Sequence, residues 1–190
     1  EFMGAFGSPN LTGAANLCMV PRMTAFKAVT GEARPAPDYD NTELVIFWGT
    51  NPFESQRFGA YCAYEGFTEI VPRLKKRGIP IICIDPYRTK TARQADEWIR
   101  INPGTDSALG LAMINFIIKE GLYDAGFVAD YTLGFTELKA HVKEFSPEWA
   151  SRKTGVSAET ICSLAKKYAE AKTAAVYEGN GLDMYVNGVD

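Results

Sequence analysis

The sequence predicts an α/β fold, a three-layer Rossmann-like domain whose mainly parallel sheet carries helices on both faces. Short continuous apolar runs, typical of strands buried on both faces, alternate with helical patterns. Turn-forming Gly, Pro, Asn and Asp follow these runs directly. A content of 46% hydrophobic and 23% charged residues over 190 residues is that of one soluble globular domain. Alternating strands and helices imply right-handed βαβ units.

The first predicted strand is Leu44–Trp48, a short apolar run. Residues 1–43 before it are rich in Gly, Pro, Ala and Asn, with one helix expected over about residues 17–29. A helical region follows over about residues 55–77, interrupted near Gly66 and Pro72. It ends in Lys75-Lys76-Arg77, a run expected to cap a helix C-terminus rather than to bind nucleic acid.

Two more strands are predicted in the middle of the chain. Ile79–Ile84, interrupted by Pro80, is closed by Asp85-Pro86, and Trp98–Ile101 is ended by Asn102-Pro103-Gly104. Thr105 is expected to be the N-cap of the next helix, which runs through Lys119. That helix is apolar nearly all round, so it is expected to be largely buried.

The last part of the chain is predicted to be helical up to a fourth strand. Gly121 is the expected C′ residue of the preceding helix. The predicted elements that follow are helices at about residues 125–130 and 135–142, one that Ser146 begins, one that Ser157 caps, and the strand Ala174–Tyr177.

The composition argues against several classes of site. The four cysteines (Cys18, Cys62, Cys83 and Cys162) form no close pair, which indicates reduced, mostly buried thiols rather than disulfides, iron–sulfur ligands or zinc ligands. The only histidine, His141, offers no His-rich metal site. No apolar run approaches the length of a membrane span. We therefore assign no catalytic residue, no metal ligand and no nucleic-acid partner.

Ligands of an open α/β sheet bind at the carboxyl ends of its strands. These ends are predicted at residues 49–55, 85–89, 103–106 and 179–184. Free backbone N–H groups and helix N-termini there favour anions, and the Asp85 and Asp106 carboxylates match a ribose hydroxyl or the two parallel N–H donors of guanine. The same residues also suit plain turns, which leaves that interpretation open. Neither a dinucleotide fingerprint nor a P-loop is present.

Six segments in this order resemble the molybdopterin oxidoreductases of the dimethyl sulfoxide reductase type, which include formate dehydrogenases and periplasmic nitrate reductases. They are LVIFWGTNPFES, IICIDPYRTKTARQAD, WIRINPGTDSALGLAM, EGLYDAGFVADYTLGF, FSPEWASRKTGVSAETICSLAKKYA and YEGNGLDMYVNGV. The resemblance runs from about Ser8 to Asp190. It implies a domain, residues 8–190, that binds one molybdopterin guanine dinucleotide of a bis-MGD cofactor carrying molybdenum or tungsten.

Carried over by position, the resemblance implies a set of cofactor contacts. Asp85, Tyr87, Arg88 and Thr89 would lie along the ribose and phosphates. The first loop would contact the dinucleotide through Trp48, Gly49, Asn51 and Glu54. The third loop would read the guanine through Gly104, Thr105 and Asp106. The two ends of the chain would add Cys18, Asn180 and Met184. Ala14 replaces the Asn of the family's Asn-x3-Cys pattern before Cys18, with Asn16 nearby.

The resemblance further implies an internal fragment of a larger enzyme with two-electron redox chemistry. The metal ligand and any iron–sulfur cysteines would lie upstream, so this chain alone is expected to be inactive. Its partners would be the remaining domains and an electron-transfer subunit, in a prokaryotic cytoplasm or periplasm. Residues 1–7 are interpreted as a cloning remnant and linker. Alternatives are a regulatory module that binds a guanine nucleotide, and a degenerate subunit without cofactor.

Overall fold

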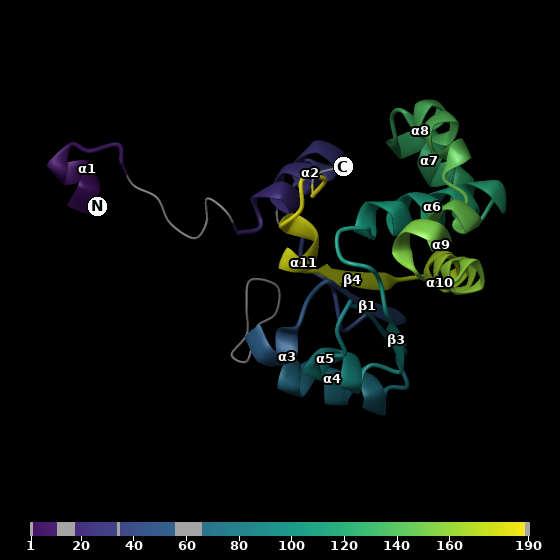
Figure 1. Cartoon of the computed structure of the whole chain (residues 1–190), viewed down its shortest axis with the longest axis horizontal. Helices are drawn as coiled ribbons and strands as arrows, with labels where there is room; N and C mark the ends of the chain where they lie inside the picture. The colour runs from purple at the N-terminus through teal and green to yellow at the C-terminus, as the bar shows by residue number, and fades with distance from the viewer. Residues whose placement is uncertain (1, 11–17, 34, 56–65, 189–190) are drawn as a thin grey trace.

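A four-stranded parallel sheet forms the centre of the computed structural model, which describes residues 2–10, 18–33, 35–55 and 66–188 (Figure 1). The strands are β1 (Leu44–Trp48), β2 (Ile81–Ile84), β3 (Glu97–Ile99) and β4 (Ala174–Glu178), in the order β3-β2-β1-β4. In β1, Phe47 pairs with Cys83 of β2 and with Tyr177 of β4. The strand order reverses at β1: β2 and β3 follow on one side of it, and β4 pairs with its other side.

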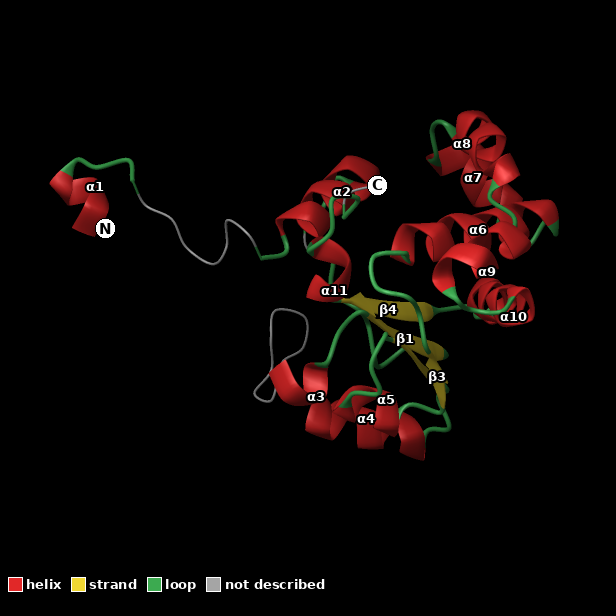
Figure 2. Cartoon of the chain, in the orientation of Figure 1, coloured by secondary structure: helices red, strands yellow, loops and turns green. Residues whose placement is uncertain are grey.

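Helices cover both faces of the sheet (Figure 2). One face carries α3 (Pro52–Ser55), α4 (Phe67–Lys76) and α5 (Lys90–Gln94). The other carries α6 (Asp106–Lys119), α9 (Pro147–Thr154) and α10 (Ala158–Glu170). The predicted three-layer α/β fold is confirmed.

The remaining elements lie outside these three layers. They are α1 (Phe2–Phe6), α2 (Val20–Thr30), α7 (Ala125–Tyr131), α8 (Phe135–His141), the 3-10 helix η2 (Val142–Glu144) and α11 (Asn180–Asp183). Figure 1 shows α2 and α11 side by side above the end of β4, and these two helices are also in contact.

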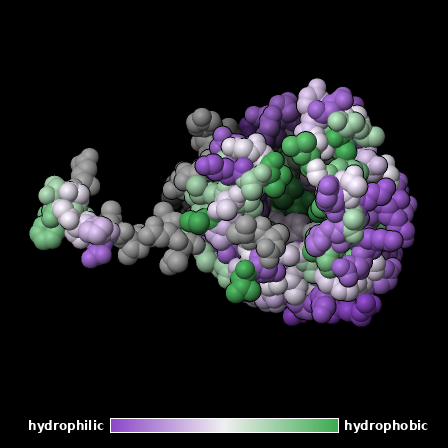
Figure 3. All heavy atoms as spheres, turned by 90° about the horizontal axis from the view of Figure 1, so that it is seen from above, coloured by the Kyte–Doolittle hydropathy of each residue, from purple (hydrophilic) through white to green (hydrophobic). Residues whose placement is uncertain are grey.

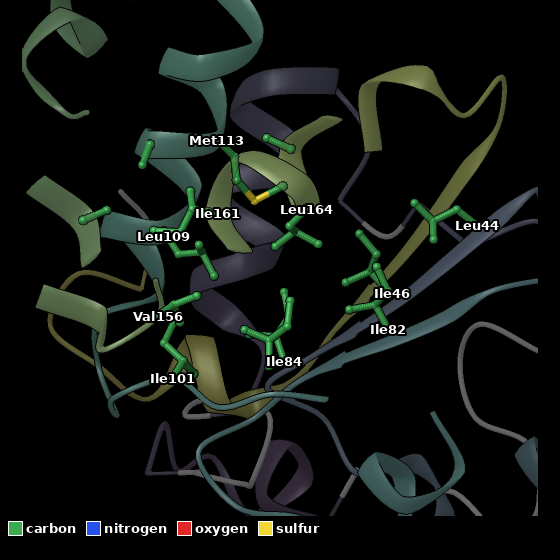
Figure 4. Packing of buried hydrophobic residues seen from close by; sticks show 14 residues of the cluster. Leu44, Ile46, Ile82, Ile84, Ile101, Leu109, Met113, Val156, Ile161 and Leu164 are labelled. Atoms are coloured by element: carbon green, nitrogen blue, oxygen red, sulfur yellow. The ribbon is translucent and has the colours of Figure 1, made fainter. Parts of the chain in front are cut away.

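Alternate residues of the strands build two separate cores, because side chains of a strand point to opposite faces. Leu44 and Ile46 pack with α6 and α10 residues such as Leu109 and Leu164 (Figure 4). Val45 and Phe47 pack on the other face with α4. Full burial of each such side chain contributes about 1.5–3 kcal/mol to the free energy of folding. The well-packed sheet therefore fixes the positions from which the loops at its ends begin.

Polar residues fix the helix starts as the sequence predicts, with one exception. The Ser146 and Ser157 hydroxyls accept from the backbone N–H groups of Trp149 and Thr160. Thr105 occupies the N-cap position of α6, but its hydroxyl donates to the Asn102 carbonyl at 2.7 Å. The cap prediction is therefore right in position and wrong in its hydrogen bond.

Four predicted boundaries differ from the structure. The second strand begins at Ile81 rather than Ile79, because the Ile79 N–H donates to the Leu74 carbonyl at the end of α4 and Pro80 has no N–H. The third strand ends at Ile99, and α2 begins at Val20. The helical region predicted from residue 55 is in fact α3 and α4, with residues 56–65 between them outside the described part.

The burial predictions are right only in part. In α6 four residues are fully buried (Ala108, Leu109, Ala112 and Met113), and the rest of the helix before Lys119 is half-buried. Among the described cysteines, Cys83 is buried and Cys18 and Cys162 are half-buried; all three are free, and Cys62 lies outside the described residues.

The described residues contain neither a membrane-spanning helix nor a group of metal-binding side chains. No helix there is long and apolar enough to cross a membrane. No cluster of His, Cys, Asp and Glu suited to a metal ion occurs among them either.

Candidate functional site

The carboxyl ends of all four strands lie at one edge of the sheet, because the strands are parallel. The loops that leave them, at residues 49–51, 85–89, 100–105 and 179–188, contain most of the predicted site residues. The sheet therefore gathers segments that are far apart in the sequence.

The loops after β1 and β3 are joined by one hydrogen bond. Trp48 ends β1, and its indole Nε1 donates to Oδ1 of Asp106 at 2.7 Å, across 58 residues of sequence. Asp106 is the first residue of α6, where the helix dipole favours a negative charge. Burial raises the pKa of the Asp106 carboxyl, and the bond from Trp48 opposes that rise.

Asp85 comes from the end of β2 and is nearly buried. Its Oδ1 accepts the backbone N–H of Tyr87 at 2.8 Å, and its carbonyl accepts the Trp98 indole N–H at 2.9 Å. Burial raises the pKa of the Asp85 carboxyl, and the negative charge of Asp106 raises it further. The two carboxylates that the sequence singled out therefore lie at the same edge of the sheet.

Glycines let the loops after β1 and β4 touch backbone to backbone. Gly49 has φ 58°, a conformation that side chains rarely adopt. A Cβ on Gly179 would stand 2.5 Å from the Gly49 carbonyl oxygen, and one on Gly181 would stand 2.7 Å from it. The loops after β1 and β4 are therefore in direct backbone contact, and the Gly181 N–H donates to the Gly49 carbonyl at 3.0 Å.

The loops after β3 and β4 also meet. Gly104 has φ 75°, and a Cβ there would stand 2.9 Å from the ring of Tyr185. Ser107 in α6 accepts from the Asn187 side chain at 3.0 Å. Tyr185 therefore lies over the loop in which Gly104, Thr105 and Asp106 were predicted to read guanine.

Two predicted contacts of the first loop face α5 instead of open space. Asn51 Oδ1 accepts from the Thr91 hydroxyl at 2.9 Å, and the Glu54 carboxylate pairs with Lys90 at 2.9 Å. These side chains hold α3 against α5. Their predicted contact with a dinucleotide remains a prediction.

The second loop presents two exposed side chains and one cap. Tyr87 is 69% exposed, and Arg88 places its guanidinium 5.8 Å from the centre of the Trp98 ring. The Thr89 hydroxyl accepts from the Ala92 N–H and so caps α5. Tyr87 and Arg88 remain available to a ligand.

The contacts from the two ends of the chain meet beside β4. The Asn180 amide Nδ2 donates to Cys18 Sγ at 3.4 Å, and Met184 is 54% exposed. Ala14 and Asn16 lie outside the described residues.

The sequence reasoning missed Arg22, Glu178 and Asp183, which join these two ends. Arg22 and Asp183 are 161 residues apart, so no local pattern pairs them.

A groove of about 780 Å³ runs along β4 and reaches this site. Its walls include Phe26 of α2, Tyr168 of α10 and Trp48 of β1, and Val176 lies on its floor. Viewed from above, the molecule is hollowed in its middle, with hydrophobic residues in the hollow (Figure 3).

Comparison with known proteins identifies relatives over nearly the whole chain. The family model described as molybdopterin oxidoreductase matches residues 1–185. The chain is 40% identical over 148 residues to the probable oxidoreductase YoaE of Bacillus subtilis, covering 78% of this chain and 21% of that protein. It is 35% identical to the F420-dependent formate dehydrogenase subunit alpha of Methanocaldococcus jannaschii, covering 98% of this chain and 27% of that subunit.

A solved structure agrees with these relatives. Acetylene hydratase from Pelobacter acetylenicus matches with a TM-score of 0.80 and 30% identity, over 99% of this chain and 25% of the hydratase. The chain thus spans about a quarter of the length of these relatives.

Proposed function

Because the chain belongs to the molybdopterin oxidoreductase family, we propose that it is the α/β domain that binds one molybdopterin guanine dinucleotide of a bis-MGD cofactor. The metal would be molybdenum or tungsten, and the whole protein would perform two-electron redox chemistry. The metal and its dithiolene ligands supply the electron transfer, while the protein binds and orients the cofactor. No substrate is assigned, because the relatives' names include a dehydrogenase and a hydratase.

One observation carries the proposal: the Asp106 carboxylate, bound by the Trp48 indole, lies at the same edge of the parallel sheet as Asp85, which the exposed Tyr87 and Arg88 follow in the loop after β2. Two carboxylates repel a phosphate but suit N–H and O–H donors, so they fit the guanine and ribose. The indole of Trp48 uses one acceptor site of Asp106. A carboxylate has about four such sites, which leaves room for the two donors of guanine.

The phosphates fit a different part of the site. Arg88 lies in the loop after β2, and its guanidinium matches phosphate geometry. The donor set therefore suits a guanine nucleotide with its base toward Asp106 and its phosphates toward Arg88.

The test is Asp106→Asn in the intact protein. The amide places an NH₂ group where guanine also has donors, so the affinity for the dinucleotide should fall about 10- to 100-fold, the value of a hydrogen bond to a charged group. GMP released by acid hydrolysis, together with molybdenum and tungsten per protein by mass spectrometry, measures the loss. Asp130→Asn makes the same chemical change on the exposed surface of α7 and is the control. Unchanged GMP content in Asp106→Asn would disprove the guanine contact.

A further inference from the structure

Arg22, in the first turn of α2, binds three residues at the carboxyl end of β4. Its Nε forms an ion pair with Asp183 Oδ2 at 3.0 Å, outside hydrogen-bond geometry, and its backbone N–H donates to Asp183 Oδ1 at 3.0 Å. Nη2 donates to Asn180 Oδ1 at 2.8 Å, and Nη1 donates to the Glu178 carbonyl. The three guanidinium nitrogens thus contact three different residues, an arrangement that the single ammonium group of a lysine cannot reproduce.

These polar contacts have little hydrophobic support. No residue of α2 is fully buried, whereas the Asp183 side chain is 0% exposed and needs a cation beside it. Met19, between Cys18 and α2, has φ 54°, a conformation that non-glycine residues keep only where their surroundings hold it. Contacts on both sides of Met19, from Cys18 to Asn180 and from Arg22 to Asp183, supply that restraint.

Arg22 also decides how the Asn180 amide points. A guanidinium only donates hydrogen bonds, so the amide oxygen of Asn180 must face Arg22. The NH₂ group then faces Cys18 Sγ, 3.4 Å away. The Asp183, Arg22, Asn180 and Cys18 side chains therefore form one continuous chain of contacts.

We propose that Arg22 is a positioning residue: its ion pair with Asp183 closes the Cys18 segment onto the loop after β4 and orients Asn180 toward Cys18. The inference rests on the proposed function, because Cys18 and Asn180 are predicted cofactor contacts. Arg22 itself is assigned no contact with the cofactor.

The test uses the intact, cofactor-free protein. Arg22→Gln should speed hydrogen exchange of the backbone amides at residues 18–31, and alkylation of Cys18, about tenfold or more, because hydrogen bonds to a charged group are lost. Cys162, half-buried on α10, is the internal reference for alkylation. Lys27→Gln removes an exposed charge from the same helix and is the matched control.

The conservative variant Arg22→Lys distinguishes a role in positioning Asn180 and the Cys18 segment from a role in filling space. Arg22→Lys keeps the charge beside Asp183 and should restore part of the protection, whereas a space-filling role would be met equally by Arg22→Gln. If Arg22→Gln folds poorly, Asp183→Asn tests the same ion pair and should also open residues 18–31. Exchange and alkylation that match Lys27→Gln would overturn the inference.

Different measurements test the role of Arg22 and the binding of guanine by Asp106. Exchange and alkylation are read without cofactor, so they test the Arg22 inference alone. GMP content in Asp106→Asn tests the proposed function alone.

Discussion

Asp106 shows how one side chain can satisfy a local rule and a distant partner at once. As the first residue of α6 it suits the helix dipole. Its carboxylate also accepts from Trp48 at the end of β1. The sequence alone pointed to Asp106 as a site residue and to Trp48 as a cofactor contact. It did not show that Trp48 orients Asp106, because that bond depends on β1 and β3 ending at the same edge.

Trp48→Phe tests this hydrogen bond. The phenyl ring keeps most of the packing but has no N–H, so the pKa of Asp106 should rise further above its ordinary value. Carbon-13 NMR of labelled aspartate carboxyls in the cofactor-free protein measures the change. Trp98→Phe is the control, because the Trp98 indole donates to the carbonyl of Asp85 rather than to a carboxylate. An Asp106 titration that is the same in both variants would contradict the role of Trp48.

At the scale of elements, the loop after β4 packs directly against the loop after β1, because the glycines at the contact have no side chain. Gly179 has φ −129°, which any residue can adopt, so its need for glycine is purely steric. The loop after β1 leaves no space for a Cβ there. The sequence marked Gly49–Ser55 and Gly179–Met184 as separate strand ends, but their direct contact depends on β4 pairing with β1.

Gly179→Ala should therefore destabilise the intact protein by about 1–3 kcal/mol, the usual cost of an overpacked site, because the added methyl meets backbone. Gly110→Ala in α6 meets nothing within 4 Å. It should stabilise the helix by about 0.5–1 kcal/mol, since alanine favours a helix over glycine. Urea unfolding midpoints compare the two variants. Equal midpoints would show that the two loops can move apart without cost.

At the scale of the whole molecule, the parallel sheet concentrates negative charge at one edge. Asp85, Asp106 and Glu178 all have a raised pKa, chiefly because of burial. Asp85 and Glu178 lie at the carboxyl ends of β2 and β4, and Asp106 begins the helix that follows β3. This arrangement is costly for the unliganded protein and suits a ligand that brings N–H donors.

The stability of the cofactor-free protein should fall as the pH rises from the ordinary carboxyl pKa values of 3.8 to 4.5 through the raised values of the folded state. The folded state binds protons to these carboxyls more tightly than the unfolded state, so deprotonation favours unfolding. Asp85→Asn combined with Asp106→Asn should make this decline shallower. Urea unfolding at several pH values measures it, and a decline as steep as that of the unchanged protein would contradict the expectation.

The sequence by itself determined the fold class, the family and the ends of the first two strands. Apolar runs and turn residues act locally, so they predict elements and mark where loops begin, as they do after Trp48 and after Ile84. Only the tertiary structure decided which loops touch. The Trp48–Asp106 bond, the Gly49–Gly179 contact and the Arg22–Asp183 pair join residues from 58 to 161 positions apart. Such pairs depend on strand order and on the crossing of layers, which no short stretch of sequence specifies.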